Sequence, residues 1–340
     1  PCSAAAHFYF SLGFRRNIHV EKGGALPCVR AQYIDRNGVF SMARGNTAKS
    51  FLLAALGGIS WGLSGVCSQY LFTKYALSAD WLTAVRMVLS GVALLLIAFS
   101  RERAKMFWIW GVGRDVRWLL AFGLAGLLLC QYTFLAAIKY SNSATAAVLQ
   151  SLNVVLMAIV MAVWNKKPMG RGQVLAVLLA IAGTYLVASK GDFHRMDFSA
   201  AGLLFGLLAA AGVVSYTLLS RPIIASWGNL TITGWGMLIG GLVLSLFTKA
   251  WNVPAALDLT AWTVIAVIVL IGTAVGFSVF LESVQYIGPV KSTLIGCLEP
   301  VSSMVFSVAA LKTQISWAEW IGFALILCTV FLSVSEKENG

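Results

Sequence analysis

Long apolar runs follow one another along the chain from about residue 50 to residue 335, and short polar segments separate them. A helix needs about 20 mostly apolar residues to cross a bilayer. The runs that approach or exceed this length are 50–72, 80–100, 117–138, 142–164, 172–189, 199–220, 230–249, 260–283, 288–311 and 316–335. The pattern therefore predicts an all-α integral membrane protein with ten transmembrane helices.

Two polar segments inside these runs resemble each other. Residues 140–154 and 286–300 correspond at a constant offset of 286 − 140 = 146 residues. This offset pairs Tyr140 with Tyr286 and Asn153 with Glu299. At the same offset, four other positions carry identical residues: Gly126 and Gly272, Phe134 and Phe280, Leu135 and Leu281, and Leu152 and Leu298. The chain is thus predicted to be a doubled unit of five helices each, in which the repeated positions face each other.

The basic residues of the loops predict the orientation of the chain. Twelve Lys and Arg residues fall on one side of the predicted membrane and six on the other. Because basic loops stay in the cytoplasm, we expect both termini to be cytoplasmic in a cell membrane, either plasma or inner. An odd number of helices per repeat inverts the second repeat relative to the first. Inverted repeats are typical of secondary transporters, whose site lies near the bilayer midplane.

The same runs predict the domain boundaries. Residues 1–49 contain no apolar run long enough to span, and we expect them to be a disordered or artefactual N-terminal extension. The first repeat is predicted at 50–189 and the second at 199–335. The polar segment 190–198 is predicted to link them.

Composition narrows the function classes. The chain is 59% hydrophobic and 11% charged, whereas a soluble domain is about 25% charged. A net charge of +12 is found in nucleic-acid-binding proteins, but here the basic residues lie between apolar runs. We therefore expect no nucleic-acid partner. The expected partners are the lipid bilayer and a small-molecule substrate, with the protein a monomer or a homodimer.

A nucleotide-binding loop and a zinc-hydrolase motif are missing from the sequence. There is no Gly-x-x-x-x-Gly-Lys-Ser/Thr loop for ATP and no His-Glu-x-x-His. The six cysteines show no paired or metal-like spacing, and the three histidines lie outside the spans. We therefore expect neither a cofactor nor a metal, and predict that the protein is not an enzyme.

The fourth and ninth predicted helices carry equivalent small and polar faces. Gln150 and Asn153 share one face with Ala146 and Met157, because helical side chains at these spacings point the same way. The equivalent face of the ninth helix comprises Ser292, Gly296, Glu299 and Ser303. Two interpretations are open. The faces either line one central cavity or pack helices together, as small residues do in membranes.

Glu299 is an acidic residue within a predicted span. A charge at the bilayer centre costs at least about 2.5–3.5 kcal/mol, so we expect its side chain to face the protein interior. Burial favours the neutral form of a carboxyl group, and a carboxyl that gains and loses a proton can couple transport to a proton gradient. Alternatively, Glu299 is structural and binds either the backbone freed by Pro300 or a cation.

Further charged residues and prolines are candidates for binding or opening. Arg86 lies six residues after Asp80, roughly 9 Å into the second span. It can bind a substrate carboxylate, or it can bind a carbonyl or reach outward. Pro289 and Pro300 are candidate helix breaks, because proline frees a backbone carbonyl. Glu282 is either a gating residue or a solvated one.

Aromatic residues at middle depth complete the candidate site. They can stack on an organic substrate or simply pack in the core, and the glycine-rich first helix permits close packing or a hinge. The candidate substrate-binding or cavity residues are Trp61, Ser64, Arg86, Tyr132, Gln150, Asn153, Tyr216, Phe277, Ser292, Gly296 and Ser303.

Several of these motifs resemble the drug/metabolite transporter superfamily, in its EamA-type branch. The motifs are Trp61-Gly62, Arg86, the hairpin Tyr140-Ser141-Asn142-Ser143-Ala144, and, most specifically, Leu298-Glu299-Pro300-Val301. The likeness covers about residues 50–335 as two EamA-like units. Val154 is a departure, because such units often carry proline there.

The resemblance implies a ten-helix transporter with inverted repeats, which moves small metabolites, often outward, by alternating access. It also implies a central cavity formed by helices one, three, four, six, eight and nine. The predicted function is therefore secondary transport of small organic metabolites, amino acids or related compounds among them, with proton coupling as one possibility. The alternatives are a facilitator or exchanger without ion coupling and a non-transporting membrane subunit.

Overall fold

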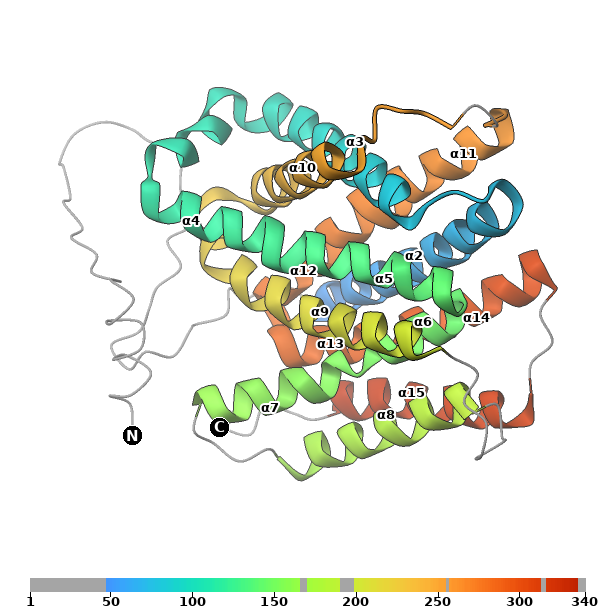
Figure 1. The fold of residues 1–340 in the computed structure, drawn as a ribbon. Coiled ribbons are helices and arrows are strands. Elements are labelled where there is room, and N and C mark those ends of the chain that lie inside the picture. Colours follow the sequence, from blue (N-terminus) through green and yellow to red (C-terminus); the bar gives the residue numbers. More distant parts are fainter. Residues whose placement is uncertain (1–46, 166–169, 190–198, 255–256, 313–315, 336–340) are drawn as a thin grey trace.

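The computed structural model describes residues 47–165, 170–189, 199–254, 257–312 and 316–335, which form a bundle of helices (Figure 1). The predicted extension lies outside the described residues, apart from its last three. These three residues are helical, so the first helix begins at Thr47 rather than at residue 50. The predicted linker 190–198 also lies outside the described residues.

Five helical segments make up the first half of the chain. The first is α2 (Thr47–Tyr75), and the second is α3 (Ala79–Glu102), which continues into the 3-10 segment η1 (Arg103–Gly111). The third comprises α4 (Gly113–Ala121), the π-helical η2 (Phe122–Leu128) and α5 (Leu129–Tyr140). The fourth comprises α6 (Ser143–Ser151) and α7 (Asn153–Asn165), and the fifth is α8 (Arg171–Ser189).

The second half repeats this order. Its segments are α9 (Ala200–Trp227), α10 (Asn229–Thr248), α11 (Leu259–Val267) with the π-helical η3 (Ile268–Val275) and α12 (Gly276–Ile287), then α13 (Pro289–Gly296) with α14 (Leu298–Leu311), and α15 (Trp317–Ser335). Over the described residues, every segment except α8 and α15 is long and apolar enough to cross a membrane. The helices α8 and α15 occupy the predicted fifth and tenth spans.

The duplication extends to the irregularities of the helices. The two π-helical segments begin at Phe122 and Ile268, which are 268 − 122 = 146 residues apart. The fourth segment is interrupted at Leu152 and the ninth at Cys297, again at nearly equivalent places. Short π-helical turns and interrupted helices are frequent at functional sites. The backbone therefore departs from regular helix at equivalent positions in both halves.

Polar side chains define where several helices begin. The Asn142 carboxamide oxygen accepts a hydrogen bond of 2.8 Å from the backbone N–H of Thr145 at the start of α6. Asp258 caps α11 in the same way, through a 2.8 Å bond from the N–H of Ala261, and it also accepts a 2.7 Å bond from the Tyr75 hydroxyl. Both bonds lower the pKa of the Asp258 carboxyl, and the bond from Ala261 has the larger effect. Such caps satisfy backbone donors that a helix leaves unpaired.

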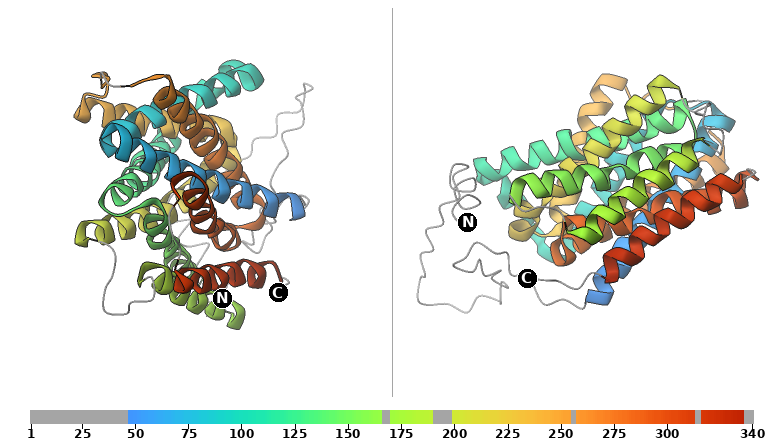
Figure 2. Two further views of the ribbon diagram at one scale, coloured as in Figure 1. Left: turned by 90° about the vertical axis from the view of Figure 1, so that its right-hand side faces the viewer. Right: turned by 90° about the horizontal axis from the view of Figure 1, so that it is seen from below.

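The two halves contact each other through closely packed helix pairs. The helix α3 runs beside α10 (Figures 1 and 2), and glycines bring their backbones together. A Cβ atom on Gly91 of α3 would lie 2.7 Å from the backbone nitrogen of Leu238. Lipid provides no hydrophobic force between helices, so this close van der Waals packing holds them together. Figure 2 shows the described segments from two further sides.

We predict that Gly91→Ala lowers the thermal stability of the purified protein in detergent by about 1–3 kcal/mol, the usual cost of overpacking. The matched control is Gly111→Ala, because nothing lies within 4 Å of a Cβ atom at Gly111. Equal melting temperatures for the two variants would show that the α3–α10 contact yields without cost.

Candidate functional site

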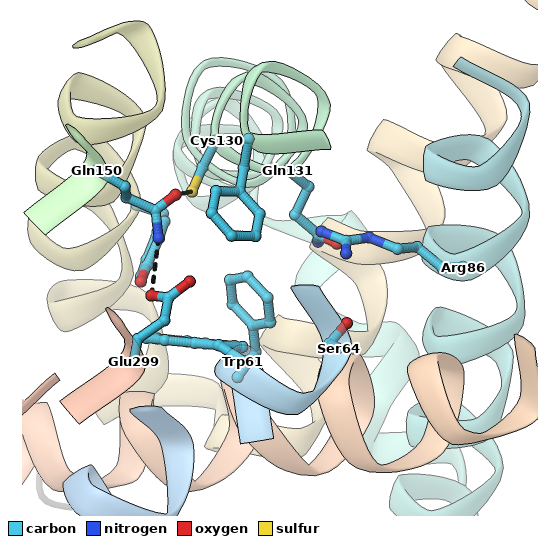
Figure 3. A pocket seen from close by; sticks show the side chains of 10 residues that line it. Trp61, Ser64, Arg86, Cys130, Gln131, Gln150 and Glu299 are labelled. Atoms are coloured by element: carbon cyan, nitrogen blue, oxygen red, sulfur yellow. Dashed lines mark hydrogen bonds between the residues drawn. The ribbon is translucent and has the colours of Figure 1, made fainter. Parts of the chain in front are cut away.

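A closed cavity of about 20 Å³ lies between the two halves (Figure 3). It offers room for about one water molecule. Its lining side chains come from seven of the helices described above, four in the first half and three in the second. They are Trp61 and Ser64 of α2, Arg86 of α3, Cys130, Gln131 and Phe134 of α5, Gln150 of α6, Tyr216 of α9, Phe277 of α12 and Glu299 of α14.

Glu299 and Gln150 join the two interrupted helices across this cavity. The Gln150 amide donates a hydrogen bond of 2.9 Å to Glu299 Oε2. The second carboxyl oxygen, Oε1, is buried and has no hydrogen-bond partner among the described residues. Glu299 is only 4% exposed. A carboxyl group at this depth therefore keeps one oxygen available for another donor.

Arg86 supplies the opposite charge from another side of the cavity (Figure 3). Its side chain is 4% exposed, so it does not reach outward to water. Its Nε–H is buried without a hydrogen-bond partner, and no salt bridge to Glu299 is present among the described residues. The cavity thus holds one acidic and one basic side chain that are not paired with each other. Unpaired buried charges are expensive in a membrane.

Three more lining residues have buried polar atoms without a hydrogen-bond partner in the described part of the chain. They are the indole Nε1 of Trp61, the hydroxyl of Ser64 and the amide oxygen Oε1 of Gln131. Each such group costs about 1–3 kcal/mol when it is left unsatisfied. Donors and acceptors therefore both converge on this cavity, which can satisfy a ligand that carries groups of both kinds.

Aromatic rings form one wall of the cavity. The Trp61 ring lies 5.0 Å from that of Phe277 and 4.8 Å from that of Phe280, both measured between centroids. Tyr216 packs on Phe277 at 5.5 Å. Aromatic faces stabilise flat apolar groups and cations. The wall therefore adds an apolar contact surface beside the charged groups.

The helix break beside Glu299 follows from Pro300 and Gly296. Proline has no N–H for the carbonyl four residues earlier, and α13 ends at Gly296. Pro289 has a different role, because it starts α13 directly after Gly288, whose φ of 81° makes a tight turn. The fourth segment breaks without proline. There the Asn153 amide donates a 2.7 Å bond to the Gln150 carbonyl and competes with the helical pattern.

The cavity is closed on both sides along α2. On one side, Gln69 Oε1 accepts bonds from the Ser143 backbone N–H at 2.9 Å and from the Ser143 hydroxyl at 2.6 Å. The Ser143 and Ser307 hydroxyls lie 3.2 Å apart. We call these three residues the Gln69 cluster, and it ties α2 to α6 and α14. On the other side, a Cβ atom on Gly58 would lie 3.0 Å from the Gly296 carbonyl oxygen.

Several predicted site residues lie outside this cavity. Tyr132 points toward Phe205, with ring centroids 6.3 Å apart. Ser292 accepts a 3.0 Å bond from the Ser283 hydroxyl. Gly296 and Ser303 lie against glycines of α2, where a Cβ on Gly62 would be 2.6 Å from the Ser303 nitrogen. The Asn153 amide binds the Gln150 carbonyl across the break between α6 and α7. At Gly296 and Ser303, the backbone of α2 approaches too closely to leave space for a cavity.

Glu282 also lies away from the cavity. Its Oε2 accepts a 3.1 Å hydrogen bond from the Asn229 amide, which also donates to the Ser278 carbonyl at 2.6 Å. Glu282 is half-buried and connects α12 to the beginning of α10. Its predicted gating role stays a prediction.

Sequence reasoning missed part of the lining. Gln131 lies in the middle of an apolar run, and the cost argument that singled out Glu299 applies to it as well. In the sequence, Phe134 is distinguished only by its match with Phe280 in the second repeat. Cys130 and Gln69 gave no signal, because single polar residues are common in transmembrane helices. Within the described residues, no group of three His, Cys, Asp or Glu side chains could hold a metal ion.

Comparisons with known proteins agree with this architecture. The sequence model of the EamA-like transporter family matches residues 48–189 and again residues 200–335. An uncharacterized inner membrane transporter of Salmonella typhimurium, YicL, is 33% identical over 288 residues, covering 85% of this chain and 96% of its own. Protein PecM of Dickeya dadantii is 23% identical, covering 80% and 88% of the two chains.

A solved structure supports the fold. A protein known by its crystal structure superposes with a TM-score of 0.64 at 18% identity, and the match covers 84% of this chain and 96% of the other. The expected assignment to a transporter rather than an enzyme follows from the family match and the YicL relationship. The chain is an all-helical membrane protein with two duplicated halves, and it belongs to the EamA-like transporter family, within the drug/metabolite transporter superfamily.

Proposed function

We propose that the protein is a secondary transporter of small zwitterionic organic metabolites, amino acids and related compounds, and that it exports them by alternating access. The observation that carries the proposal is the closed cavity in which Glu299 and Arg86 are buried but not paired. Glu299 Oε1 is suited to accept from a substrate ammonium group, and Arg86 to donate to a carboxylate. The aromatic wall is suited to the remaining apolar part of such a substrate.

The size of the cavity supports alternating access. Sites for small molecules measure about 300–1,000 Å³, whereas this cavity of about 20 Å³ holds no metabolite. The described conformation is therefore a closed one, and α2 must separate from its neighbours on one side at a time. Separation on one side breaks the Gln69 cluster. Separation on the other side breaks the contact between Gly58 and Gly296.

The proposed location is a cell membrane with both termini in the cytoplasm. The distribution of Lys and Arg between the loops supports this orientation. The description of YicL as an inner membrane transporter supports the location. The two predicted repeats, 50–189 and 199–335, would then have opposite orientations in the membrane.

Proton coupling through Glu299 is the proposed energy source, and a facilitator or exchanger is the alternative. Coupling requires a carboxyl group that changes its charge and its hydrogen bonds during the cycle. The free Oε1 of Glu299 supports this role. The bond from Gln150 favours the alternative, because Glu299 would then only hold α6 and α14 together.

We predict that Glu299→Gln abolishes flux driven by a pH gradient in proteoliposomes but preserves substrate exchange without a gradient. Glutamine keeps the size of the side chain and an oxygen for Gln150, but it cannot gain or lose a proton. Glu282→Gln is the matched control, because Glu282 lies outside the cavity. If Glu299→Gln retains gradient-driven flux, Glu299 is a structural residue and the carrier is not proton-coupled through it.

We predict that Arg86→Ala weakens the transport of substrates that carry a carboxylate by at least about tenfold. A hydrogen bond to a charged group contributes about 1.5–3 kcal/mol, and 1.4 kcal/mol corresponds to a factor of ten. Uptake of amino acids is compared with that of the matching amines, and Arg101→Ala provides a control at the exposed end of the same helix. An equal loss for both substrate classes would assign Arg86 to structure.

We predict that Gln69→Ala exposes the cavity to the side of the membrane on which the Gln69 cluster lies. The variant loses the two bonds from Ser143, so the open conformation becomes more populated. The reaction of Cys130 in the cavity with a membrane-impermeant maleimide, followed by mass spectrometry in sealed vesicles, should become faster. Thr73→Ala, which removes only a bond within α2, should react like the wild type. Unchanged labelling in Gln69→Ala would exclude this cluster as a closure.

A further inference from the structure

A second, larger hollow lies on the opposite face of α2. It has a volume of about 450 Å³ and is lined almost entirely by apolar side chains. Three helices frame it, and we call it the α2–α11–α14 groove. Its lining residues are Leu63, Val66, Cys67 and Tyr70 of α2, Thr260 and Val264 of α11, and Phe306, Ala309, Ala310 and Leu311 of α14.

The groove is shaped to receive an extended apolar chain. The α2 residues that line it are spaced three or four apart, so they form a continuous stripe along about 10 Å of helix. Ala309 and Ala310 are exposed, and their small side chains leave the space open. The exposed neighbours Val305 and Val308 show that this side of α14 faces outward from the bundle. In a spanning protein, that direction is the lipid.

Charged side chains mark one end of the groove. Lys74 Nζ donates a 2.9 Å hydrogen bond to the hydroxyl of Tyr70, and it lies 5.4 Å and 5.2 Å from the ring centroids of Tyr70 and Tyr75. Lys312, which is exposed, directly follows Leu311 of the lining. The acidic group at this end is Asp258, which the Tyr75 hydroxyl contacts at 2.7 Å. Among these three described side chains, two positive charges and one negative charge leave an excess of one positive charge.

We propose that the α2–α11–α14 groove binds one acyl chain of a glycerophospholipid, and that Lys74 binds the phosphate of its headgroup. The volume and apolar lining of the groove suit the chain, and the net positive charge at its end suits the phosphate diester. Lys74 is held in place by Tyr70 rather than extended freely. A lysine near the membrane surface attracts anionic lipid headgroups.

This site borders the transport pathway without sharing its residues. Leu63 lines the groove, whereas the next residue, Ser64, lines the closed cavity. A bound acyl chain therefore packs against the outer face of the helix that closes over the cavity. The proposal stands on the groove and its charged end alone, and it does not depend on the substrate or on proton coupling.

Native mass spectrometry of the purified full-length protein tests the proposal, with phosphatidylglycerol and diacylglycerol as the added probes. The wild type should retain phosphatidylglycerol in preference to diacylglycerol, which lacks the phosphate. Ala310→Phe fills the groove and should lose both lipids. Val308→Phe is the matched control, because Val308 lies on the same helix, is 38% exposed and does not line the groove. Lys74→Gln should lose the preference for phosphatidylglycerol and keep the binding of diacylglycerol.

Two results would overturn the proposal. One is retention of phosphatidylglycerol by Ala310→Phe at the level of Val308→Phe. The other is an unchanged lipid preference in Lys74→Gln, whose exposed position leaves folding intact even where Ala310→Phe fails to fold. If Ala310→Phe changed only the ratio of monomer to dimer, the groove would be an interface with a second copy of the chain and not a lipid site.

Discussion

The structure depends on how a buried carboxyl group is accommodated inside a membrane. Glu299 lies in a span where lipid offers no water and no hydrogen bond. Its side chain therefore points inward, and the Gln150 amide from the other half satisfies one of its oxygens. This single bond connects the two interrupted helices at the places where their backbones also need partners. The cavity, the helix breaks and the contact between the halves all meet at this point.

Duplication explains the framework, and its imperfections explain the site. The π-helical segments and helix breaks recur at equivalent positions, so both halves bend at the same depth. The side chains at these positions differ. Asn153 stands where the second half has Glu299, and its amide donates to the backbone carbonyl of Gln150. A symmetric scaffold thus carries an asymmetric distribution of charge, which suits the proposed substrate with its two different ends.

In the proposed transport cycle, opening and closing depend on the helix α2. Its glycines pack against α13 and α14, its Gln69 binds α6, and its Trp61 and Ser64 line the cavity between these contacts. The α2–α11–α14 groove lies on its other face. Transport and the proposed lipid site are thus linked through the position of one helix. Both sets of contacts along α2 are formed in the described conformation, so the proposed opening breaks one set while the other stays in place.

The sequence by itself determined the membrane class, the ten helical segments, the doubling and the buried position of Glu299, because apolar length, repeat spacing and the cost of a buried charge are all local properties. It also predicted helix breaks at Pro289 and Pro300; the structure has a break at Cys297, close to Pro300, whereas Pro289 begins α13. Only the tertiary structure decided which polar residues share a cavity. Gln131 and Cys130 line the cavity, whereas Tyr132, Ser292 and Ser303 pack elsewhere. Residues one position apart on a helix differ by about 100° in direction, and only packing against other helices decides what each of them meets.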